Sequence, residues 1–92
     1  NPLLFVELSN TVVIRNKVND LTLKYPGYCA IFTGNDENGY SFIIGSSTKD
    51  CREMAALLKE AFGAKGGGTA PMIQGSVTAA KAQLQTFFQK LA

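Results

Sequence analysis

The chain has 92 residues, of which 46% are hydrophobic and 17% charged, and its formal net charge is +2. These values are typical of one small globular domain and exclude an intrinsically disordered chain. No apolar stretch approaches the ~20 residues that a membrane-spanning helix requires, so we expect no transmembrane segment and no membrane partner.

The first residues and the cysteines indicate whether the chain is part of a longer protein and in which cellular compartment it occurs. The sequence begins at Asn1-Pro2, without a methionine or a basic-then-apolar leader, which predicts a piece of a longer protein. Cys29 and Cys51 have no metal-ligand spacing, and two cysteines are too few for a disulfide scaffold. We therefore expect a reducing, cytoplasmic setting.

The first half of the chain predicts a strand, a helix and a β-hairpin. Residues 2–8 form an apolar run of strand length, and Ser9 or Asn10 can cap a helix over about residues 10–24. Residues 28–33 and 40–45 flank a turn-forming segment, which predicts two antiparallel strands. Because both are apolar on two faces, we expect them in a sheet that is covered on both sides, or at the centre of a sheet.

The second half predicts two helices around a glycine-rich loop. Residues 46–48 supply helix caps, with Asp50 or Glu53 completing a capping box, and Gly63 ends the helix. The apolar stripe of this helix consists of Met54, Leu57, Leu58, Ala61 and Phe62. Residues 70–74 fit a short strand. A last helix opens at Ser76 or Thr78, and its apolar face consists of Ala80, Leu84, Phe87, Phe88 and Leu91.

This order of elements predicts an α/β fold in a single domain over residues 1–92. The expected architecture is a small mixed β-sheet of about four to five strands, packed by about three helices.

The run Lys65-Gly66-Gly67-Gly68-Thr69 is the most informative local feature. Three glycines can take positive φ, and their N–H groups can then converge on an anion beside the Lys65 charge. Residues 61–92 hold three lysines and no acid, which also favours an anionic partner. A phosphate-binding loop is one interpretation, and a flexible connector is the other.

This chain lacks the residues that most catalytic mechanisms require. The sequence contains no histidine, the most frequent general base and metal ligand. Cys29 and Cys51 fit structural positions better than nucleophilic ones, and Asp36 with Glu37 fits a solvated turn better than a cation site. The glycine run is neither a Walker A loop nor a dinucleotide fingerprint. We predict a non-catalytic domain without a cofactor of its own.

The segment Gly63-Ala64-Lys65-Gly66-Gly67-Gly68, followed by Met72 and Gln74-Gly75, resembles the signature of the DHH-associated domain. This domain is found at the C-terminus of alanyl-tRNA synthetases and alanyl-tRNA editing proteins, and it also occurs in DHH phosphoesterases. The predicted order of elements resembles the family along nearly the whole chain. Thr69-Ala70-Pro71 stands where the synthetases usually have Arg-Pro-Asp, which points to the editing-type branch. No histidine follows Gly68, unlike in the phosphoesterases.

The resemblance implies an accessory, tRNA-binding role beside a catalytic domain missing from this chain, in an editing hydrolase or a synthetase-related ligase. It also implies a possible homodimer, and zinc only in a missing editing domain. The nucleic-acid-binding residues would be Lys65, Gly66, Gly67, Gly68, Thr69 and Gln74.

Two alternative functions stay open. One is the substrate-binding domain of a DHH-family phosphoesterase, in which the glycines would hold a nucleotide phosphate. The other is an oligomerisation or interdomain module, in which Phe87 and Phe88 would supply apolar contact.

Overall fold

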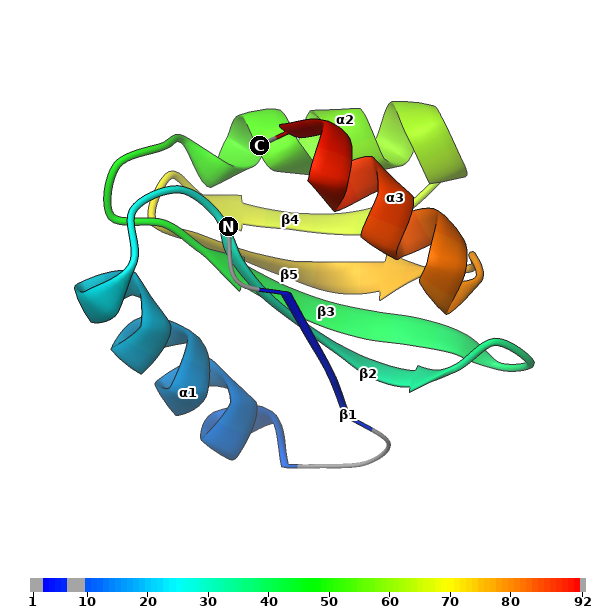
Figure 1. Ribbon diagram of the computed structural model, residues 1–92, viewed down its shortest axis with the longest axis horizontal. Helices are drawn as coiled ribbons and strands as arrows, with labels where there is room; N and C mark the ends of the chain where they lie inside the picture. Colours follow the sequence, from blue (N-terminus) through cyan, green and yellow to red (C-terminus); the bar gives the residue numbers. More distant parts are fainter. Residues whose placement is uncertain (1–2, 7–9, 92) are drawn as a thin grey trace.

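The computed structural model describes residues 3–6 and 10–91, and within these it has three helices and one five-stranded mixed sheet (Figure 1). The predicted α/β fold is thereby confirmed. The elements in chain order are β1 (Leu3–Val6), α1 (Thr11–Lys24), β2 (Cys29–Asn35), β3 (Gly39–Gly45), α2 (Cys51–Phe62), β4 (Lys65–Thr69), β5 (Met72–Val77) and α3 (Lys81–Leu91).

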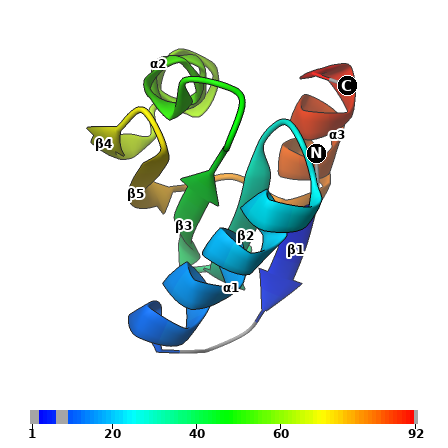
Figure 2. The same ribbon diagram turned by 90° about the vertical axis from the view of Figure 1, so that its left-hand side faces the viewer.

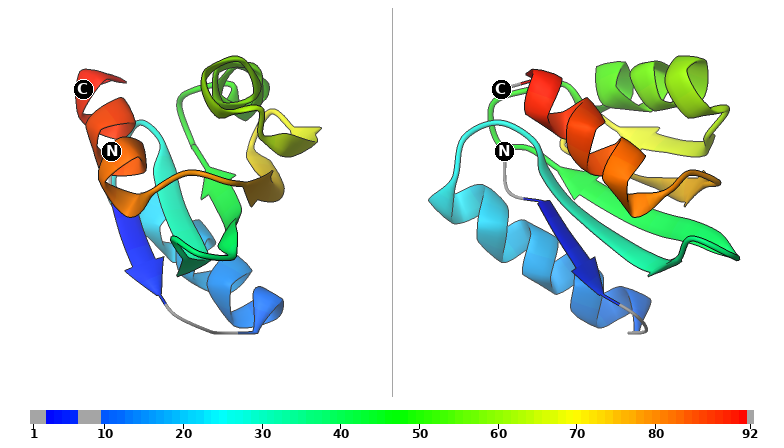
Figure 3. Two further views of the ribbon diagram at one scale, coloured as in Figure 1. Left: turned by 90° about the vertical axis from the view of Figure 1, so that its right-hand side faces the viewer. Right: turned by 45° about the vertical axis from the view of Figure 1, so that its right-hand side comes forward.

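The sheet has the strand order β1-β2-β3-β5-β4, in which only β1 pairs in parallel with its neighbour. Helix α1 lies on one face, and α2 and α3 lie on the other (Figures 1 and 3). Of the strand predicted over residues 2–8, the part at 3–6 is present, and the rest lies outside the described residues. No helix in the described part of the chain is long and apolar enough to cross a membrane.

The hairpin of β2 and β3 forms the centre of the sheet. Phe32 lies opposite Phe42, and Ile31 lies opposite Ile43. Because directly opposite residues share a face, the two phenylalanines face α2 and α3, whereas the two isoleucines face α1. The hairpin therefore carries a core on each side, as its two-sided apolar pattern predicts.

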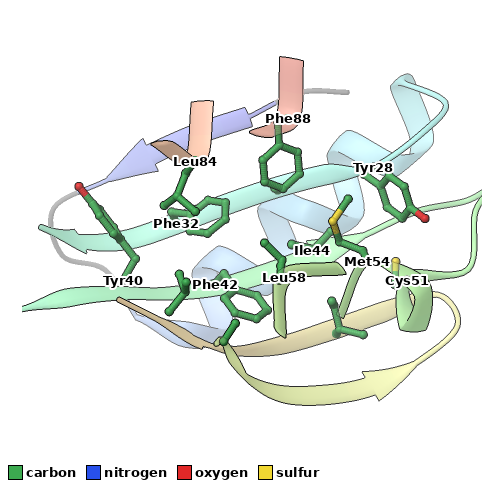
Figure 4. Close-up of a cluster of buried hydrophobic side chains, with 14 residues drawn as sticks. Tyr28, Phe32, Tyr40, Phe42, Ile44, Cys51, Met54, Leu58, Leu84 and Phe88 are labelled. Carbon is green, nitrogen blue, oxygen red and sulfur yellow. The ribbon is translucent and has the colours of Figure 1, made fainter. Parts of the chain in front are cut away.

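The larger core is organised around Phe32, which is fully buried. Its ring centroid lies 5.4 Å from that of Phe5, 5.9 Å from that of Phe42 and 5.8 Å from that of Phe88. Figure 4 shows Leu84 and Phe88 of α3 pointing toward Phe32, while Leu58 and Met54 reach the same core from α2.

Helix α1 begins and ends close to the predicted positions. The side chain of Asn10 accepts a hydrogen bond of 2.8 Å from the N–H of Val12, which caps the helix. Ile14 and Val18 are buried against Ile31 and Ile43 and form the smaller core.

Helix α2 is capped by Asp50 rather than by residues 46–48. The Asp50 carboxylate accepts the N–H of Arg52 at 2.9 Å, and Gly63 closes the other end with φ 68°. The predicted stripe is wrong at Leu57 and Ala61, which are exposed. At 3.6 residues per turn, a single line of buried residues runs through Cys51, Met54 and Leu58, and Leu57 lies about 100° away from it.

Helix α3 begins at Lys81, later than predicted, because β5 continues through Ser76 in order to pair with β3. The Asp36 carboxylate accepts the Lys81 N–H at 2.9 Å, and the Gln83 side chain accepts the Ala80 N–H at 2.9 Å. Leu84 and Phe88 are buried, as expected from their spacing. The side chain of Leu91 lies outside the described part.

Candidate nucleic-acid interface

The glycine run is a β-strand, and the prediction of a loop is wrong. Residues 65–69 form β4, an edge strand paired antiparallel with β5 in the register Gly66–Gly75 and Gly67–Gln74. Among the three consecutive glycines only Gly66 has a positive φ, of 132°. Successive N–H groups of a strand point in opposite directions, so the described backbone forms no converging cradle. Turn residues at 70–71 join two short strands, and this local pairing orders the glycines.

Close backbone approach explains most of these glycines. A Cβ at Gly66 would overlap the carbonyl oxygen of Gln74. A Cβ at Gly75 would overlap the carbonyl oxygen of Lys65 and would lie 2.9 Å from Cζ of Phe42. Gly68 is similarly close to the backbone of β5. These three glycines therefore serve packing of β4 against β5.

Gly67 is different from its neighbours. A Cβ there would meet nothing within 4 Å, and its φ is not positive. No contact in the described structure requires glycine at this position. The open space above Gly67 lets a ligand approach the backbone of β4 closely.

The sheet register gathers the predicted site residues on the face that carries α1. Gln74 lies opposite Ile43, which packs against α1, and Gly67 lies opposite Gln74. Lys65 and Thr69 lie two residues on either side of Gly67 and share its face. The predicted residues thus divide into two sets. Lys65, Gly67, Thr69 and Gln74 face the α1 side, and Gly66 and Gly68 face the α2 side.

Arg15 belongs to this face and was not predicted. It projects from α1, and its guanidinium donates a hydrogen bond of 2.5 Å to the side-chain oxygen of Gln74. The two residues are 59 positions apart in sequence, so no local motif joins them. The sequence offers one weak indication of this position. Arg15 directly follows Ile14, which faces the sheet, so on a helix its side chain lies about 100° from the buried side.

The charges of this face are positive. Among the described residues, the one salt bridge joins Arg52 to Asp50 on the other side of the sheet. Arg15 and Lys65 therefore form no ion pair within the described part. The lysines of residues 61–92 do not gather into one patch, because Lys81 Nζ lies 5.1 Å from the centroid of the Phe5 ring and Lys90 lies on α3.

The two cysteines are core residues. Both are fully buried, and burial raises the pKa of the Cys51 thiol to about 11, with the Asp50 carboxylate as a second cause. Burial also raises the pKa of Cys29. Raised pKa values disfavour the thiolate, so neither side chain is suited to nucleophilic chemistry at neutral pH.

Asp36 lies in the exposed turn of the hairpin, as predicted, and its carboxylate also has a structural role. Its carboxylate accepts a hydrogen bond of 2.7 Å from the Tyr40 hydroxyl and one of 2.9 Å from the Lys81 N–H. The hydrogen bond from Tyr40 lowers the pKa of Asp36, and the backbone hydrogen bond adds to this effect. The carboxylate ties the hairpin tip to the start of α3. No group of three or more potential metal ligands gathers within the described part of the chain.

Comparison with known proteins leaves the family resemblance a prediction. No family model matches the chain, and no curated protein sequence matches it either.

Alanine substitutions can distinguish a glycine that the packing of the sheet requires from one that it does not. Gly75→Ala should destabilise the fold by about 3 kcal/mol, because its Cβ would meet the backbone of β4. Gly67→Ala should change the free energy of unfolding by less than about 0.5 kcal/mol. Chemical denaturation of both variants measures the difference, and equal losses would contradict the distinction.

Acid stability should depend on Asp36. Because its pKa is lowered in the folded state, its hydrogen bonds stabilise the fold fully above the ordinary aspartate pKa of about 3.9. This contribution is lost as the pH falls through the lowered pKa. Asp36→Ala should lower the melting temperature at neutral pH and reduce the further drop on acidification. Asp20→Ala is the control, because Asp20 is exposed on α1, and it should change neither value.

Proposed function

We propose that this chain is a tRNA-binding accessory domain of an alanyl-tRNA synthetase-related or alanyl-tRNA editing protein of the cytoplasm, and that it is non-catalytic by itself. The observation that carries the proposal is the gathering of Lys65, Gly67, Thr69 and Gln74 beside Arg15 on one face of the sheet edge. This gathering joins cations with amide and hydroxyl groups, without a paired carboxylate in the described part.

Each residue of this face has a role in the proposed complex. Lys65 and Arg15 bind phosphate oxygens, and the guanidinium can do so in a bidentate manner. The side-chain amide of Gln74 donates to phosphate or ribose oxygens. The Thr69 hydroxyl donates to the Met72 carbonyl at 3.4 Å, so its part is to accept a hydrogen bond from a ribose hydroxyl. Gly67 lets the strand backbone come within hydrogen-bond distance of the ligand, because no Cβ stands in the way.

Chemistry on the bound tRNA belongs, in this proposal, to a separate domain of the parent protein. This chain has no histidine, and its cysteines are buried with raised pKa values. Zinc, where the parent uses it, is proposed for that separate editing domain.

Binding should be weak and strongly dependent on salt. With two cations on the face, the logarithm of tRNA affinity should fall with the logarithm of salt concentration with a slope of about −2. Lys65→Ala should reduce this slope by about one and weaken binding at low salt. Lys90→Ala is the matched control, because it removes the same charge from α3 on the opposite face.

Fluorescence polarisation with labelled tRNA at a series of salt concentrations measures both quantities. Absence of binding at low salt would contradict the proposal. Equal effects of Lys65→Ala and Lys90→Ala would instead show a diffuse electrostatic attraction without a site.

Self-association is a second candidate function, and the open edge of β4 favours it. This strand pairs with β5 on one side only, and all five of its residues are exposed. A free strand edge can pair with a second copy of the chain. The predicted aromatic contact gives no support, because Phe88 is buried and Phe87 packs against Phe62 at 5.4 Å between ring centroids.

Sedimentation equilibrium tests this candidate. Pairing through the edge predicts a dimer whose fraction rises with protein concentration. A monomer at high protein concentration would contradict it.

A further inference from the structure

A groove lies between α1 and the central strands, next to the face described above. It has a volume of about 440 Å³, and its lining includes Thr11, Ile14, Thr33, Ser41, Ile43 and Gln74. We call it the α1 groove. Figure 2 shows α1 lying across β2 and β3, with β5 and β4 beyond it. Its volume falls within the range of small-ligand sites in proteins, which is roughly 300–1,000 Å³.

A row of polar side chains crosses the sheet at this groove. Thr33 lies opposite Ser41, Ser41 opposite Ser76, and Ser76 opposite Lys65, so the row runs over β2, β3, β5 and β4. Opposite residues share a face, and Thr33 alternates with Ile31 of the α1-side core, which places the whole row on the α1 side. With strands about 4.8 Å apart, the row spans about 14 Å.

The hydroxyl groups of the row are available to a ligand. Those of Thr33, Ser41 and Ser76, like that of Thr11 at the start of α1, make no hydrogen bond to any described residue. A hydroxyl both donates and accepts, which matches the hydroxyls of a ribose. Beside them, Ile14 and Ile43 line the groove only with the small exposed parts of their side chains, 6% and 5%.

Cations stand at the border of the α1 groove. Arg15 is held there by its hydrogen bond to Gln74, which itself lines the groove, and Lys65 ends the polar row. No acidic residue is among the lining side chains in the described part. The arrangement combines a set of hydroxyls and a positive border in one concavity.

We propose that the α1 groove binds one unpaired ribonucleotide of an RNA strand. The base occupies the groove, the ribose contacts Thr33 and Ser41, and the phosphate contacts Arg15. The inference rests on the proposed function, because it names the part of the RNA that the same side of the sheet recognises. A paired nucleotide has its base edge engaged and its face stacked, whereas an unpaired one can enter a concave site.

Binding of short oligonucleotides tests the occupant. We expect the 92-residue chain to bind a short single-stranded ribo-oligonucleotide more tightly than a blunt-ended RNA duplex, and more tightly than the deoxy counterpart, which lacks the 2′-hydroxyl. The double variant Thr33→Val with Ser41→Ala should weaken ribo-oligonucleotide binding about tenfold and remove the preference for RNA over DNA, because it deletes two neutral hydrogen bonds.

Two controls accompany this variant. Thr78→Val deletes an exposed hydroxyl outside the groove and should leave affinity unchanged. Arg15→Ala should weaken binding, whereas Lys17→Ala should not, because Lys17 lies about 200° around α1 from Arg15. Thermal unfolding of each variant confirms that the fold is intact. If the double variant unfolds, the single Ser41→Ala substitution at an exposed position serves in its place.

The outcomes separate this inference from the proposed function. If tRNA binding depends on Lys65 but the duplex binds as well as the single strand and the Thr33–Ser41 variant is neutral, the groove assignment is overturned and the tRNA proposal stands. If the chain binds the single strand through the groove but does not bind tRNA, the tRNA proposal is overturned and the groove assignment stands. Competition by AMP at equal affinity would assign the groove to a free nucleotide and overturn its assignment to a strand.

Discussion

The packing around Phe32 is the contact on which the rest of the structure depends. This one side chain joins β1, β3 and α3 through the rings of Phe5, Phe42 and Phe88. A fully buried phenylalanine contributes about 3–5 kcal/mol relative to alanine, which is a large part of the stability of a small domain. Because the alternate residues of the same two strands pack against α1, the hairpin fixes both layers at once.

The second constraint is the close approach of β4 to β5. Gly66 and Gly75 lie opposite each other, and neither leaves room for a Cβ. This pairing places Lys65 at the end of the row that starts at Thr33, three strands away. Gly66 and Gly75 thus influence the candidate site indirectly, because they permit the register that positions its side chains. Only Gly67 has open space above its backbone.

The elements that local chemistry specifies were predictable from the sequence. The Asn10 cap, the Gly63 helix end and the hairpin each depend on residues close in the chain, and all three are present. The fold class followed from their order. Failures occurred where tertiary pairing overrode local preference. Three glycines disfavour a strand by themselves, yet pairing with β5 holds them in one.

The late start of α3 has the same cause as the strand at the glycines. Ser76 is a good helix cap, but its pairing with Ser41 keeps it in β5. The candidate site was predicted only in part for a related reason. Lys65 and Gln74 belong to one short segment that a motif can mark, whereas Arg15 reaches Gln74 across 59 positions. Such a contact depends on the packing angle of α1, which no local pattern encodes.

The proposed role is consistent with how little charge the site carries. Two cations cannot hold a polyanion tightly at physiological salt, because each phosphate contact weakens as counterions compete. A weak site still contributes strongly when it is linked to a second one, since the linkage raises its effective concentration to about the millimolar range. The sparse charge of this face therefore suits an auxiliary contact on an RNA that another domain also binds. On this view the hydroxyls beside Arg15 matter more than further lysines would, because they add selectivity for ribose without adding salt-sensitive attraction.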